Sequence, residues 1–150
     1  MVSLVFYECK KGKIVGYWDS VNSFQQRGID HDLVDCLEFN SQDGFSVEDI
    51  KRVLAVWEGE NDGDDWRWIL VLNSGKFVFL QGGCDYTGWD CQSSANSIIC
   101  DDIKDIVSAM RNPMRFSENN DTIIIHLVKQ LIGTKDKTWH EQTGKEMGLL

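Results

Sequence analysis

A short stretch, residues 82–94, carries the side chains in this chain that are best able to do chemistry. It reads Gly-Gly-Cys-Asp-Tyr-Thr-Gly-Trp-Asp-Cys-Gln-Ser-Ser and shows neither a helical nor a strand period. Cysteine thiolates bind zinc or act as nucleophiles, and carboxylates bind hard cations. We therefore expect an irregular loop whose candidate ligands or catalysts are Cys84, Asp85, Asp90 and Cys91.

Zinc is the first metal to consider, because Cys84, Cys91 and Cys100 follow one another along the chain. Structural zinc sites usually use cysteines about two to four residues apart, whereas six residues separate Cys84 from Cys91. Cys9, Cys36 or a histidine would have to complete the site. We interpret the cysteines first as small buried hydrophobes, with zinc binding second and a redox pair third.

A second stretch, residues 58–65, places five carboxylates in eight residues around two glycines. This composition is typical of a calcium loop, but the twelfth position counted from Glu58 is Ile69, not the glutamate that completes an EF-hand. A cation site shared with Asp85 or Asp90 is the alternative. We favour a hairpin turn whose charges discourage unwanted strand pairing.

Three β-rich runs surround these two stretches. They are rich in β-branched and aromatic residues and are separated by glycine turns, and they cover residues 52–58, 66–72 and 76–81. The pattern predicts an antiparallel meander, in which both stretches fall at the same end of the sheet. In the middle run, apolar and polar residues alternate only near Trp66, so we expect that end of the strand to be the more solvated one.

Four further segments predict a hairpin, a short turn and an irregular region. Residues 2–7 and 14–18 read as the two strands of the hairpin. A capping arrangement at Ser46 predicts a helical turn there. Residues 19–43 are expected to be mostly irregular.

The C-terminal half predicts the helices. Aspartates in the first turn and a stop at Asn112-Pro113 predict a helix over residues 101–110. A segment from Asp121 that stops at Gly133 has the spacing of a buried helical face, and residues 138–147 add a short helix. The fold class is α+β: an antiparallel sheet, a meander of about three to five strands, with about two or three helices packed on it, mainly from the C-terminal half.

Composition limits the classes of protein that this chain can belong to. With 150 residues and 42% hydrophobic content, we expect one domain over residues 1–150. The net charge of -9 argues against direct nucleic-acid binding and favours a basic partner. Residues 28–50 alone hold seven acids without any lysine or arginine.

No apolar run approaches the ~20 residues that span a bilayer. The five cysteines, an odd number, predict reduced thiols and a cytoplasmic protein.

Tryptophans could complete a binding surface at the shared end of the sheet. If the first two strands pair, Trp57 lies near Trp66 or Trp68, and Trp89 could return over them, so that a cation would meet aromatic faces and acids. The candidate binding residues are Trp57, Glu58, Glu60, Asp64, Asp65, Trp66, Asp85, Tyr86, Trp89 and Asp90. The alternative is a tryptophan-lined core with acids at its rim.

The run Trp-Glu-Gly-Glu-Asn-Asp-Gly-Asp-Asp-Trp at residues 57–66, followed by the Gly-Gly-Cys stretch to Ser94, resembles a family of small bacterial and phage-associated proteins. Residues 137–141 are similar to the same family. The resemblance draws attention to the two stretches and implies no catalytic role.

The leading functional hypothesis is a non-enzymatic acidic module that binds a basic surface of a partner protein, as an immunity, antitoxin-like or anti-defence protein does. It needs no cofactor, and the oligomeric state stays open. The alternative is a metal- or thiol-dependent enzyme, or a binder of small cationic ligands, that uses residues 82–94.

Overall fold

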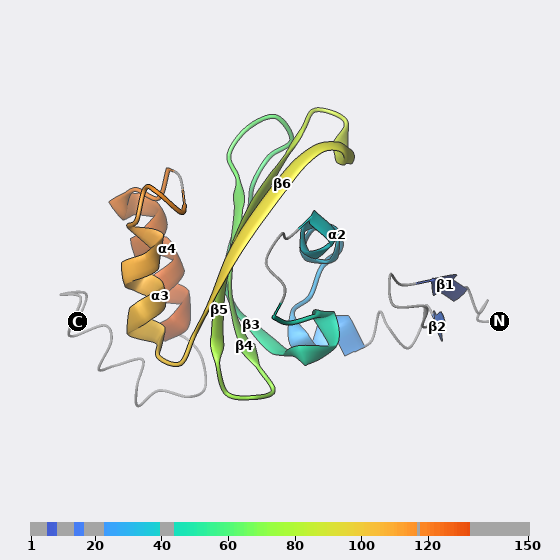
Figure 1. Cartoon of the computed structure of the whole chain (residues 1–150), viewed down its shortest axis with the longest axis horizontal. Helices are drawn as coiled ribbons and strands as arrows, with labels where there is room; N and C mark the ends of the chain where they lie inside the picture. Colours follow the sequence, from blue (N-terminus) through green and yellow to red (C-terminus); the bar gives the residue numbers. More distant parts are fainter. Residues whose placement is uncertain (1–5, 9–13, 17–22, 40–43, 117, 133–150) are drawn as a thin grey trace.

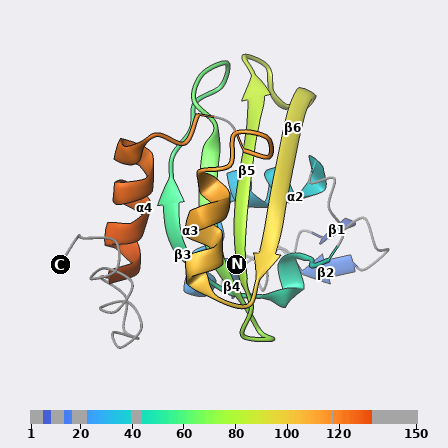
Figure 2. The ribbon, with the colours of Figure 1, turned by 60° about the vertical axis from the view of Figure 1, so that its left-hand side comes forward.

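The centre of the protein is a four-stranded antiparallel sheet with the strand order β3-β4-β5-β6 (Figure 2). The computed structural model describes residues 6–8, 14–16, 23–39, 44–116 and 118–132. The strands are β3 (Ile50–Trp57), β4 (Trp66–Leu72), β5 (Phe77–Asp85) and β6 (Gly88–Cys100). A separate antiparallel pair consists of β1 (Phe6–Glu8) and β2 (Ile14–Gly16).

Helices cover both faces of the four-stranded sheet (Figure 1). On one face lies α2 (His31–Phe39), and on the other lie α3 (Ile103–Met110) and α4 (Asp121–Ile132). Each face has its own cluster of buried side chains. The predicted α+β class with an antiparallel meander and C-terminal helices is confirmed.

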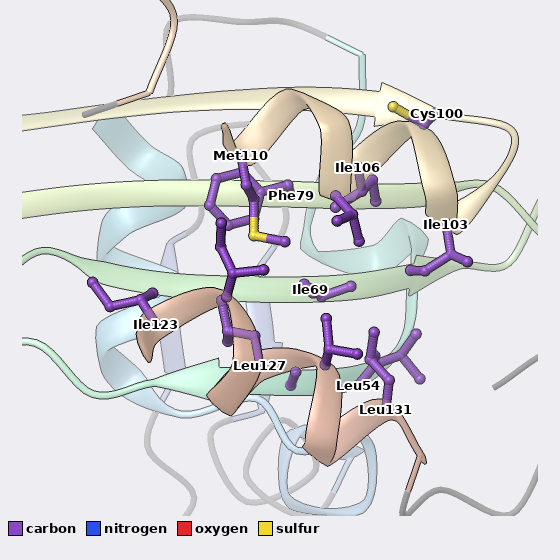
Figure 3. Close-up of a cluster of buried hydrophobic side chains, with 14 of the residues drawn as sticks. Leu54, Ile69, Phe79, Cys100, Ile103, Ile106, Met110, Ile123, Leu127 and Leu131 are labelled. Atoms are coloured by element: carbon purple, nitrogen blue, oxygen red, sulfur yellow. The ribbon is translucent and has the colours of Figure 1, made fainter. Parts of the chain in front are cut away.

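The core under α3 and α4 follows the helical spacing seen in the sequence. Ile106 and Met110 of α3 and Leu127 of α4 are buried against Ile69 and Phe79 of the sheet (Figure 3). Asp102 caps α3, because its side chain accepts a hydrogen bond from the Lys104 N–H. In both α3 and α4, apolar residues three and four positions apart fall on one face of the helix, and that face is buried against the sheet.

The prediction of an irregular segment over residues 19–43 is wrong for its described part. Residues 23–27 are helical, and α2 begins after Asp30, whose Oδ1 accepts from the Leu33 N–H at 2.9 Å. Leu33 and Cys36 are fully buried under the sheet. Leu33, Cys36 and Leu37 have the i, i+3, i+4 spacing of one helical face, a signal that sequence reasoning missed. Burial of this face stabilises the helix.

The prediction that residues 82–94 form an irregular loop is also wrong. β5 runs on to Asp85, and β6 starts at Gly88, whose φ of 92° turns the chain. The register pairs Gly82 with Ala95 and Gly83 with Ser94. Backbone hydrogen bonding to a neighbouring strand needs no side-chain alternation, so these strands leave little periodicity in the sequence.

The other predicted elements agree with the structure where it describes them. The turn at Ser46 is the 3-10 helix η1 (Val47–Asp49), with the predicted capping box. The end of the second helix at Gly133, the helix over residues 138–147 and parts of the N-terminal hairpin lie outside the described residues. Within the part of the chain that the structure describes, no helix is both long and apolar enough to traverse a membrane.

Candidate functional site

Residues 58–65, which link β3 to β4 and are called here the acidic connection, lie at the same end of the sheet as the cysteine-containing hairpin formed by β5 and β6. Trp66, which follows the connection, pairs with Gly82. The Asp62 N–H donates to the Cys84 carbonyl at 2.9 Å, and the Cys84 thiol donates to Asn61 Oδ1 at 3.3 Å. The connection over residues 58–65 therefore lies against the end of β5.

Two adjacent glycines allow this close packing. A Cβ atom on Gly82 would meet the Cys36 Sγ of α2, and a Cβ atom on Gly83 would meet Asp65 Oδ1. Successive strand residues face opposite sides of a sheet. The Gly-Gly pair thus admits α2 on one side and the acidic connection on the other.

The end of the sheet presents exposed acids and one exposed aromatic ring. We call this surface, made of Glu58, Glu60, Asp62, Asp64 and Tyr86, the acidic tip; each of its side chains is exposed, and Tyr86 reaches 78%. The salt bridges found among the described residues, His31–Asp32 and Lys76–Asp101, leave these carboxylates out. Their charges therefore face solvent.

Two aspartates at the N-terminal end of α2, Asp30 just before it and Asp32 in its first turn, extend the negative charge. Asp30, Asp32 and Glu58 each place an oxygen within 4.8 Å of the others. Asp32 also accepts a hydrogen bond from the Trp89 Nε1–H at 3.1 Å, so its carboxylate is held in place. Like charges this close raise the local negative potential and favour a cationic partner.

The expected tryptophan cluster does not form as a surface. Trp66 and Trp89 contact each other with ring centroids 5.2 Å apart, but they are only 4% and 7% exposed and belong to the α2 core. Trp57 lies on the opposite face, edge-on to His126 of α4 with a centroid separation of 5.1 Å. Adjacent strand residues alternate in direction, which separates Trp57 from Trp66 and Trp68 across the sheet.

Arg67 is the residue that sequence reasoning missed. The Trp66 end of β4 was expected to be solvated, yet Arg67 is fully buried. Its Nε donates to Asn119 Oδ1, its Nη1 to the Asp65 carbonyl at 2.7 Å, and its Nη2 to the Glu118 carbonyl at 3.2 Å. Burial lowers the pKa of Arg67, and the negative charge of Asp65 opposes that shift.

Gln81 closes a network around this guanidinium. Asn119 Nδ2 donates to Gln81 Oε1 at 3.0 Å, and Gln81 Nε2 donates to Asp65 Oδ2 at 2.9 Å. Asp65 is therefore a structural residue rather than part of the exposed site. The only signal in the sequence was a charged residue inside a strand that is otherwise apolar, which indicates a paired buried charge.

The cysteines do not gather into a metal site in the described part of the chain. Cys84 pairs across from Ser93, whereas Cys100 pairs with Phe77, so about 23 Å of strand separates them. Burial, reinforced by Asp32, raises the pKa of the Cys84 thiol and so disfavours the thiolate that a nucleophile or zinc ligand requires. The side chains of Asp90 and Cys91 lie outside the described residues.

No protein-family model, curated protein or solved structure matches this chain. The resemblance of residues 57–94 to small bacterial and phage-associated proteins therefore stays a prediction.

Proposed function

We propose that this chain is a non-enzymatic interaction module that binds a basic surface of a partner protein through the acidic tip. The observation that carries the proposal is the group of four exposed carboxylates, Glu58, Glu60, Asp62 and Asp64, on one short connection beside the exposed ring of Tyr86. Complementary charge speeds encounter with a basic partner and selects against acidic ones.

The shape of the tip favours a macromolecular partner over a small cation. Trp66 and Trp89 are buried and hold the tip from below, so their ring faces are not open to a ligand. Tyr86 is the aromatic residue that a partner can cover, and tyrosine is among the residues that contribute most to protein interfaces. Four exposed acids beside one exposed tyrosine match a basic protein surface.

The partner relationship is of the immunity, antitoxin-like or anti-defence type, and the chain works in the cytoplasm. The described cysteines Cys36, Cys84 and Cys100 are free thiols, which supports a reducing compartment. The net charge of -9 supports a basic protein rather than a nucleic acid as the partner.

Matched charge-reversal variants test the proposal. The double variant Glu58→Lys/Glu60→Lys changes the tip, and the double variant Glu48→Lys/Asp105→Lys makes the same change of net charge at exposed positions elsewhere. Each protein, immobilised, is exposed to lysate of the source cells. Wild type and the control should capture the same basic protein, and salt raised from about 50 to about 500 mM should release it. Equal capture by the tip variant refutes the proposal.

The alternative function, a metal- or thiol-dependent enzyme or a small cationic-ligand binder at residues 82–94, has less support. Cys84 is buried, and its raised pKa keeps the thiol protonated. Metal analysis of protein purified without chelator, together with Cys84→Ser and Cys91→Ser, separates the two functions. Stoichiometric metal that is lost in either variant would favour the alternative.

A further inference from the structure

A pocket with a volume of about 700 Å³ lies on the face of the sheet covered by α3 and α4. Trp57 at the end of β3 and Asp64 of the acidic connection form one side. The segment that links α3 to α4 forms the other side. Small-molecule sites in proteins commonly measure about 300–1,000 Å³, so this pocket has the size of a ligand site.

The pocket carries charged groups of both signs. Arg111, the C-cap residue of α3, and the carboxylates of Asp64 and Glu118 line it. All three side chains are exposed, and none of the salt bridges among the described residues involves them. A ligand that carries only one charge would pair with the pocket groups of opposite sign and would be repelled by the groups of its own sign.

The buried Arg67 fixes the wall that bears Glu118. Its guanidinium donates to the Glu118 carbonyl and to Asn119 Oδ1. The Asn119 amide is held at its other end by Gln81. Because this wall is tied to the sheet by hydrogen bonds, the position of Glu118 relative to Trp57 is set before any ligand arrives.

One residue that lines the pocket, Trp57, has an uncharged donor without a partner among the described residues. The Nε1 atom of Trp57 is shielded from solvent, and no acceptor for it exists among the described residues. A buried N–H group without an acceptor costs stability, and because the atom is shielded, a ligand in the pocket would contact the indole ring and not this donor. The half-buried Trp57 and the exposed Pro113 provide the accessible apolar wall, and Met110, Phe116 and Ile123 lie buried behind it.

We propose that this pocket binds a small zwitterion with an apolar body, on the scale of an amino acid or short peptide. Arg111 pairs with the ligand carboxylate, Asp64 and Glu118 pair with its ammonium group, and the apolar wall takes its side chain. The site shares Asp64 with the acidic tip proposed to bind a partner protein, whereas Glu58 and Glu60 do not line it.

Calorimetry and ¹H–¹⁵N NMR on the full chain test the proposal with phenylalanine and the dipeptide leucyl-phenylalanine as probes. The comparators are the C-terminal amide of each, which is only a cation, and the N-acetyl form of each, which is only an anion. At least one zwitterion should bind with a Kd of about 1 mM or tighter. Both of its comparators should bind about tenfold more weakly, and the indole N–H signal that Trp57→Phe removes should shift.

Charge-neutralising variants identify the pocket. Arg111→Gln and Glu118→Gln should each weaken zwitterion binding about tenfold, and Arg111→Gln should bind the cationic amide at least as well as wild type does. Lys129→Gln and Asp105→Asn, at exposed helix positions outside the lining, are the matched controls and should change nothing. The proposal is overturned if neither zwitterion binds at about 10 mM, if the comparators bind equally well, or if the pocket variants behave like the controls.

Discussion

Gln130 of α4 closes the outer edge of β3 by bonding to both backbone groups of Val56. Its Oε1 accepts from the Val56 N–H at 2.9 Å, and its Nε2 donates to the Val56 carbonyl at 2.7 Å. β3 is the terminal strand in the sheet order, so this side-chain amide takes the place of a neighbouring strand. The pair of bonds anchors α4 and covers part of an edge that could otherwise pair with another chain.

Replacing Gln130 with alanine should therefore destabilise the protein. Two partly buried backbone groups lose their partners, which costs about 1–3 kcal/mol of unfolding free energy in urea titrations. Gln130→Glu keeps an acceptor but loses the donor, so it should also destabilise. Lys129→Ala, at an exposed neighbouring position, is the control and should stay within about 0.5 kcal/mol of wild type. A Gln130→Ala protein as stable as the control would contradict the anchoring role.

Arg67 should be among the most sensitive positions in the chain. Arg67→Ala leaves the Asn119 side chain and the carbonyls of Asp65 and Glu118 without the donor that satisfies them. Breaking a buried charged network in this way costs about 3–5 kcal/mol. Lys51→Ala, an exposed cation on β3, is the matched control for urea unfolding. A loss of less than about 1 kcal/mol in Arg67→Ala would show that the network adds little stability.

Stability should fall at alkaline pH because of the buried thiol of Cys36. Burial, with help from Asp65 and Asp32, raises the pKa of Cys36 above its ordinary value of 9.0. Below pH 9.0 the Cys36 thiol stays protonated in both the folded and the unfolded state. Above it the unfolded chain releases a proton that the folded protein retains, so the folded state loses stability by up to about 1.4 kcal/mol per pH unit.

Urea unfolding between pH 7 and 10, with Cys36→Ala as the comparison, measures this effect. The variant should be less stable at pH 7 and should show a shallower decline above pH 9, the ordinary pKa of the thiol. Cys84 and Cys100 also have raised pKa values and account for part of the remaining decline. Parallel curves for the two proteins would exclude Cys36 as a source of the pH dependence.

Substitutions at Trp89 and Tyr86 should have different effects: changes at Trp89 lower stability, and a change at Tyr86 weakens partner binding. Trp89 packs against Trp66 and Phe39, so Trp89→Ala should cost ~3–5 kcal/mol. Trp89→Phe keeps a ring and loses the bond to Asp32, at a cost of about 1 kcal/mol beyond any change in packing.

The neighbouring Tyr86 is exposed, and Tyr86→Ala should change stability by less than about 0.5 kcal/mol while weakening capture of the basic partner. Thermal unfolding and the capture assay, run on the same preparations, provide the two readouts. A Tyr86→Ala protein that captures the partner like wild type would remove the tyrosine from the interface.

The meander and the C-terminal helices follow from local patterns in the sequence. The apolar spacing of Ile106, Met110, Leu127 and Leu131 follows the 3.6-residue helical period, and the glycine turns delimit β4 at both ends. The same turns imply that residues 58–65 and the start of the hairpin at Gly82 share one end of the sheet, because antiparallel connections alternate between ends.

Which of these residues form a surface depends on how the strands and helices pack together. Trp57, Trp66 and Trp89 are near one another along the sheet, but the pleat sends Trp57 to α4 and the other two to α2. Arg67 is buried because Asn119, 52 residues away, supplies its acceptor. Local periodicity carries information about elements, whereas the pairing of a buried charge depends on a contact between distant segments that no local pattern encodes.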